Sequence, residues 1–76
     1  MKDYKTLYSD RIKALIPNIN AADKLHTMEK VEISRPTLDK YLKGQIVKQD
    51  TAISIIEVLT ERINGRYNSL KAIQIN

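Results

Sequence analysis

The sequence predicts an all-α fold of four to five short helices. Its 76 residues include only two glycines and two prolines, so few positions interrupt regular structure. No run of strand length alternates between apolar and polar residues, and no tight hairpin signal joins two such runs. Apolar residues recur instead at spacings of three and four, which is the period of amphipathic helices.

The amino-acid composition excludes several kinds of site. There are 13 Lys and Arg against 9 Asp and Glu, and no cysteine. Disulfides and thiolate metal sites are therefore excluded, and His26, the one histidine, predicts no metal site by itself. The polar start has no apolar run of signal-peptide or membrane-span length, so we expect a soluble, cytoplasmic protein with no membrane partner. At this length we expect one domain, residues 1–76, with a small core.

The first helix is expected over about residues 2–15. It carries an apolar stripe that Pro17 ends, because proline disfavours a helical residue before it. The members of the stripe are Tyr4, Tyr8, Ile12 and Leu15, with Leu7 beside them. A second helix is expected from Asn20, a good N-cap, with Asp23 in the first turn. Its predicted inner stripe is Ala21, Leu25, Met28 and Val31.

The third helix is predicted to start after Ser34 as N-cap, with Arg35 and Pro36 at its first two positions. Leu38 and Tyr41 are expected to face inward, with Leu42 a further candidate. Gly44 is placed to end the helix in a left-handed conformation. All four tyrosines are interpreted as core residues with the hydroxyl at the edge.

Asp50 or Thr51 is expected to cap a fourth helix. Its stripe comprises Ala52, Ile56, Leu59 and Ile63, widened by Ile53, Ile55 and Val58. The spacing continues past Gly65 through Tyr67, Leu70 and Ile73. One long helix through Gly65, at a cost of about 1 kcal/mol, is favoured over a break that would give a short fifth helix. We define the C-terminal extension as about residues 64–76.

The segments 20–31 and 34–43 form two short helices joined by about three residues. Such a short turn makes the helices cross steeply, as in a helix-turn-helix unit, which here spans about residues 20–44. The third helix then exposes mainly polar side chains, and its size suits the major groove of DNA. Residues 34–48 hold four cations and one acid, so most of the chain's net charge of +4 lies there.

The stretch "EISRPTLDKYLKG" resembles the turn and recognition helix of lambda-repressor-like DNA-binding domains, both the Cro and phage-repressor type and the lac-repressor type. The following "VKQDTAISIIEVL" is similar to their next helix. The resemblance is good over residues 31–59 and loose over 20–30. There are two departures: Glu32 stands where the family usually has glycine, and Met28 stands where it buries a small residue.

The resemblance implies a set of DNA-contacting residues. Ser34 would cap the helix and touch a phosphate, and Arg35 and Pro36 would face the groove. Thr37 would lie near the sugar-phosphate or a thymine methyl, with Lys40 one turn further on. Asp39 would accept from a cytosine amine or pair with Lys43. The residues that would approach phosphates are Lys43, Gln45 and Lys48.

The expected function is sequence-specific binding of double-stranded DNA by a small phage or mobile-element regulator, as a repressor or activator. The alternative is a helical protein-interaction module, antitoxin-like or adaptor, in which the third helix is scaffold and the exposed apolar C-terminal stripe is the contact surface. No nucleophile motif, phosphate loop or metal cluster indicates an enzyme, a cofactor or a small-molecule substrate. Two roles are left open for residues 66–76. They could form the contact between two copies in a homodimer, or they could pack back onto the first helix.

Overall fold

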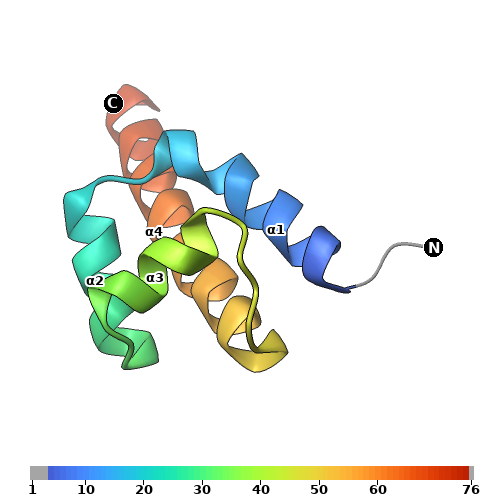
Figure 1. Ribbon diagram of the computed structural model, residues 1–76. Coiled ribbons are helices and arrows are strands. Elements are labelled where there is room, and N and C mark those ends of the chain that lie inside the picture. Colours follow the sequence, from blue (N-terminus) through green and yellow to red (C-terminus); the bar gives the residue numbers. More distant parts are fainter. Residues whose placement is uncertain (1–3, 76) are drawn as a thin grey trace.

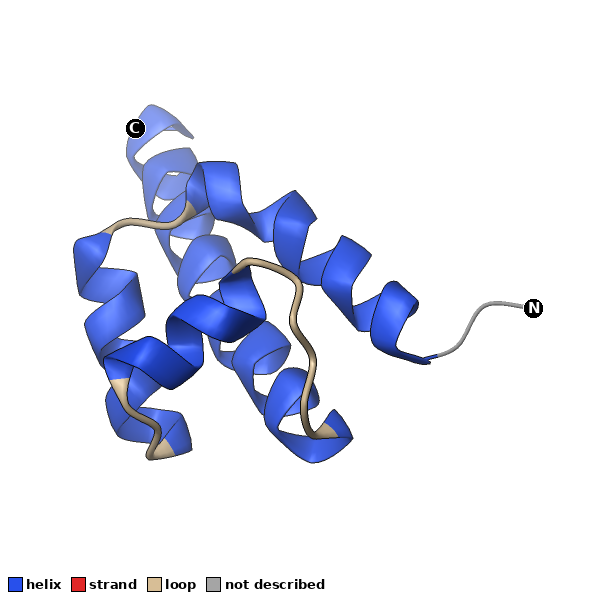
Figure 2. Ribbon diagram, viewed as in Figure 1, coloured by secondary structure: helices blue, strands red, loops and turns tan. Residues whose placement is uncertain are grey.

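The computed structural model describes residues 4–75, and the side chains of residues 5–67. Within that range every regular element is a helix, which confirms the all-α prediction (Figures 1 and 2). The elements are α1 (Tyr4–Leu15), a 3-10 turn η1 (Ile16–Asn18), α2 (Ala21–Val31), α3 (Arg35–Leu42) and α4 (Gln49–Ile75).

The long helix α4 is the central element of the fold. In Figure 1 it runs behind the other elements, and α1 and α2 both pack against it. The short helix α3 crosses in front and contacts α1 and α2. Helix α4 passes through Gly65 without a break, so the prediction of continuity is confirmed and no fifth helix forms.

The core lies where α1, α3 and α4 meet. Seven hydrophobic residues are buried there: Ile12, Leu38, Tyr41, Ile46, Ala52, Ile55 and Leu59. The predicted inward positions of α3 are confirmed, because Leu38 and Tyr41 are only 1% and 2% exposed. Leu42 packs against the core without being fully buried.

The predicted inner face of α2 is wrong in its first half. Leu25 is 56% exposed and Ala21 is exposed, whereas Asp23 and Thr27 are completely buried. Met28 and Val31 do pack on the core. The helix is rotated because the Asp23 carboxylate turns inward to meet two arginines of α4, which the apolar pattern of α2 cannot reveal.

Two other apolar assignments are also corrected. Leu7 is 55% exposed on α1, and Tyr67 is 65% exposed on α4. Tyr67 is therefore no core residue. Tyr41 and Tyr8 do contribute to the core or its edge, while the side chains of Tyr4, Leu70 and Ile73 lie outside those described.

The start of α4 differs from the prediction as well. Neither Asp50 nor Thr51 caps it, because the helix already begins at Gln49. The Lys48 carbonyl accepts a hydrogen bond from the Ala52 N–H at 3.1 Å, and the Lys48 N–H donates to the Tyr41 hydroxyl at 2.9 Å. A buried tyrosine from α3 thus fixes where α4 starts.

Candidate nucleic-acid interface

The turn between α2 and α3 has the backbone geometry that a short helix-helix connection needs. Glu32 ends α2 in the left-handed region, with φ 58° and ψ 53°. The next residue, Ile33, donates its N–H to the Met28 carbonyl at 3.1 Å. Residues other than glycine pay a steric penalty in this region. Glu32 therefore adopts the conformation for which glycine is suited.

The N-terminus of α3 is capped as predicted. The Ser34 hydroxyl accepts from the Thr37 N–H at 3.4 Å, and the two hydroxyls lie 3.0 Å apart. Pro36 stands in the first turn, where a missing N–H does no harm. Ser34 and Pro36 are exposed, whereas Thr37 is half-buried with its hydroxyl already engaged.

The outer face of α3 is polar and open. Pro36, Lys40 and Lys43 follow at spacings of four and three, so they share one side of the helix, and all three are exposed. The opposite side carries Leu38 and Tyr41, which anchor the helix in the core. This division fixes the orientation of α3 and leaves a surface of about two turns free to contact another molecule.

Arg35 and Asp39 lie on the flank of α3 that faces α2. They are four residues apart and border a small hollow of about 80 Å³ together with Lys24, Leu25 and other residues of α2. Arg35 is exposed and Asp39 is half-buried. The alternative pairing of Asp39 with Lys43 is not made, since the structure contains no ion pair between them.

The loop after α3 is held close to the helix end. Gly44 has φ 95°, as predicted for a left-handed helix end, and its N–H donates to the Tyr41 carbonyl. The Gln45 N–H donates to the Lys40 carbonyl at 2.9 Å. Together with the bond from the Lys48 N–H to the Tyr41 hydroxyl, these contacts keep both exposed loop residues, Gln45 and Lys48, near the C-terminus of α3.

The cations of this face are not neutralised within the described part of the chain. No carboxylate there lies within ion-pair distance of Arg35, Lys40, Lys43 or Lys48. The two ion pairs that do form use arginines of α4. The positive charge of the α3 face is therefore available to an anionic partner.

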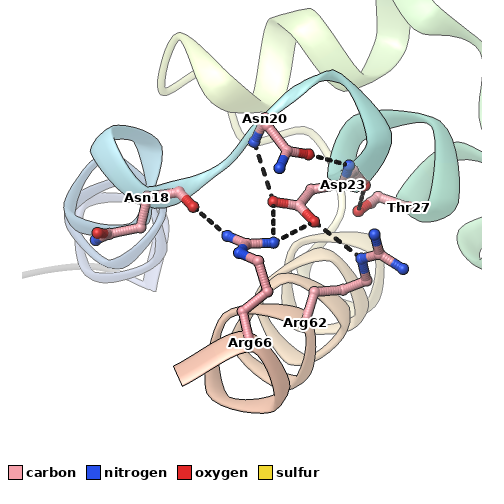
Figure 3. A network of polar contacts seen from close by, with 6 residues as sticks. All are labelled: Asn18, Asn20, Asp23, Thr27, Arg62 and Arg66. Carbon is pink, nitrogen blue, oxygen red and sulfur yellow. Dashed lines mark hydrogen bonds and ion pairs between the residues drawn. The ribbon is translucent and has the colours of Figure 1, made fainter. Parts of the chain in front are cut away.

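A polar cluster that the sequence did not predict joins α2 to α4 (Figure 3). The Asp23 carboxylate accepts from Arg62 Nε at 2.9 Å and from an Arg66 nitrogen at 2.7 and 2.8 Å. It also closes a capping box with Asn20, each side chain accepting the other's N–H. Arg66 additionally donates to the Asn18 carbonyl. The cluster ties η1, the start of α2 and the far half of α4 together.

The electrostatics of Asp23 follow from these contacts. Burial raises the pKa of its carboxyl, but hydrogen bonds from Arg66, Arg62 and the Asn20 N–H outweigh it. The pKa therefore lies below its ordinary value of 3.8. Asp23 remains charged at neutral pH, and its position suggests a structural role because it has no access to solvent.

Two other features were looked for in the part of the chain that the structure describes, a metal-binding cluster and a membrane-spanning helix. No group of three or more His, Cys, Asp or Glu side chains in that part of the chain could hold a metal ion. None of the helices searched there has both the length and the apolar character needed to cross a bilayer. Comparison with models of known families, with curated proteins and with solved structures gives no match for this chain.

Proposed function

We propose that this protein is a sequence-specific binder of double-stranded DNA that reads the major groove with α3. The supporting observation is the two-sided character of this helix. Its inner face is locked into the core by Leu38 and Tyr41, and its outer face presents exposed cations without ion-pair partners. A rigidly held, positively charged helix at the end of a tight turn suits insertion into a groove lined by phosphates.

The residues divide by role. Arg35 lies in the first turn of α3 and reads a base, for which the favoured geometry is two hydrogen bonds to guanine. Pro36 offers only an apolar contact, and Lys40 lies one turn further on the same helix. Lys43 and Lys48 neutralise phosphates at the other end of α3.

The remaining candidates make supporting contacts. Ser34 and Gln45 meet the sugar-phosphate backbone, one at each end of α3. Thr37 lies near the sugar-phosphate or contacts a thymine methyl. Asp39 accepts from a cytosine amine on the flank beside Arg35.

The biological role that fits is a small transcriptional regulator of phage or mobile-element type, acting as a repressor by occupying an operator in the cytoplasm. One recognition helix reads few base pairs, so two copies on a two-fold site are required for selectivity. The segment 66–76 is one candidate contact between copies. In it Arg66 is bound to Asp23, and Tyr67 is exposed.

Selection of bound sequences from random DNA, followed by titration of single variants, tests the proposal. Arg35→Ala is expected to lose ~1–3 kcal/mol on the selected site and to relax the choice at one base pair. Lys43→Ala and Lys48→Ala should instead weaken binding to selected and scrambled duplexes alike. Each should reduce the slope of log affinity against log salt by about one unit.

Lys30→Ala is the matched control. Lys30 is exposed but lies beside α4, next to Val58 and Glu61, and not on the α3 face. Its replacement should leave both the site preference and the salt slope unchanged. Equal loss by Arg35→Ala on both duplexes would refute base reading by Arg35.

The second candidate is a helical interaction module without DNA binding, antitoxin-like or adaptor. It is favoured by one observation, the exposed apolar side chains Leu7, Leu25 and Tyr67. Absence of affinity for any duplex at low salt, in the folded protein, would support this candidate and exclude the first.

A further inference from the structure

An apolar groove runs between α1 and α4. It has a volume of about 590 Å³. Its apolar lining comes from Leu7 and Ala14 of α1 and from Ile53 and Ile56 of α4. Leu7 is 55% exposed, and the two isoleucines are only half-buried. None of these residues has a role in the α3 face.

The groove combines one largely exposed apolar side chain with half-buried ones. Leu7 stands on the wall with more than half of its surface exposed, while Ile53 and Ile56 lie deeper. A surface with both features can meet a copy of itself across a two-fold axis, since Leu7 of each copy enters the groove of the other. Isologous contacts require this self-complementary shape.

The charges at the groove are also self-complementary. Arg11 and Asp10 line it from α1, and Glu57 lines it from α4. None of these three side chains forms an ion pair with another described residue. In a two-fold contact that sets Arg11 of one copy opposite Glu57 of the other, this pair forms twice per dimer. Such opposite charges at the edge of an apolar contact set partner and register.

The groove leaves the α3 face free. Gly44, at the end of α3, lies against the side of α1 that carries Ser9 and Lys13. Leu7, Arg11 and Ala14 follow at spacings of four and three and occupy a different side of α1. A molecule seated in the groove therefore does not cover the end of α3.

We propose that a second copy of this chain occupies the groove, giving a two-fold dimer held by Leu7 and by reciprocal Arg11–Glu57 pairs. The proposal rests on the proposed function in one respect, which is that a two-fold DNA site needs two copies. The contact differs from the one considered for residues 66–76, because it uses the half of α4 that begins at Gln49.

Charge exchange between copies provides a direct test by sedimentation equilibrium of the full chain without DNA. Arg11→Glu places two acids opposite each other, and Glu57→Arg places two arginines opposite each other. Each variant alone should dimerise at least about tenfold more weakly than wild type. Mixing the two variants should restore dimerisation, because both cross-pairs then join opposite charges. An effect within one chain would not be rescued by mixing.

A matched pair of apolar variants tests the role of Leu7. Leu7→Glu should weaken the dimer at least about tenfold, because the charge would have to be buried in the contact. Leu25→Glu is the control, since Leu25 is equally exposed but lies on α2 outside the groove. Circular-dichroism melting of each variant checks that the fold persists.

The outcomes separate the proposals. A wild-type chain that stays monomeric up to about 1 mM would overturn the groove dimer, even if it binds DNA. Loss of the dimer by Tyr67→Glu but not by Leu7→Glu would overturn it too, in favour of residues 66–76. A dimer that is broken by Leu7→Glu and rescued by mixing supports the groove, even where no duplex is bound and the proposed function fails.

Discussion

Asp23→Asn is the most informative change for the stability of this fold. The substitution keeps the size of the side chain and one oxygen that can accept from the Asn20 N–H. It removes the charge and turns an amide donor toward Arg62 and Arg66. Because Asp23 is completely buried, no water can replace the lost interactions at its own position.

The magnitude follows from the exposure of the partners. Removing one partner of a fully buried ion pair lowers the free energy of unfolding by about 3–5 kcal/mol. The main reason is that the remaining charge has neither an ion-pair partner nor contact with water. Here the side chains of Arg62 and Arg66 are 33% and 40% exposed, so both can turn toward water. We therefore expect a loss of about 2 kcal/mol at pH 7. For a domain of this size that corresponds to a fall in Tm of roughly 8–16 °C.

The pH dependence gives the effect a signature. The pKa of Asp23 in the folded state lies below its ordinary value. The ionised Asp23 therefore contributes its full share to the free energy of unfolding at any pH above the unfolded pKa of about 3.9. This contribution is lost as the pH falls through the lower folded pKa. The difference between wild type and Asp23→Asn should be constant from about pH 5 to 8 and shrink in stronger acid.

Urea denaturation followed by circular dichroism at pH 7 and pH 3 measures this difference. Glu29→Gln is the control, because Glu29 is exposed on the same helix and should change stability by no more than about 0.5 kcal/mol. A variant as stable as wild type at pH 7, or a difference that grows in acid, would refute the role assigned to Asp23.

Four further predictions concern packing and backbone, each measured as the free energy of unfolding in urea. Leu38→Ala should lose ~2–5 kcal/mol, and a stability near wild type would mean that α3 is not anchored there. Gly44→Ala should destabilise, because φ is 95° and the new Cβ would stand 2.6 Å from Ser9. Gly65→Ala should stabilise by about 1 kcal/mol, since it lies within α4 with open space beside it. Glu32→Gly should stabilise by about 1 kcal/mol by relieving the left-handed strain, and a loss would show that the Glu32 side chain contributes.

Local signals in the sequence predicted where α2 and α3 begin and where α3 ends, but not where α4 begins. Asn20 and Ser34 cap α2 and α3, and Gly44 is left-handed after α3, because a cap is a contact between residues three or four apart. The inward face of α3 was equally predictable from the spacing of Leu38 and Tyr41. The candidate DNA-contacting residues were identified by resemblance, and the exposure of most of them follows from that same periodicity.

The sequence by itself determined that the chain is helical, where α2 and α3 begin and end, and which side of α3 is polar. Only the tertiary structure decided how α2 is rotated and where α4 starts. Asp23 meets arginines 39 and 43 residues away, and the Tyr41 hydroxyl holds the Lys48 N–H. Hydropathy assigns a carboxylate to the surface, and it turns inward here because folding brings two guanidinium groups to meet it.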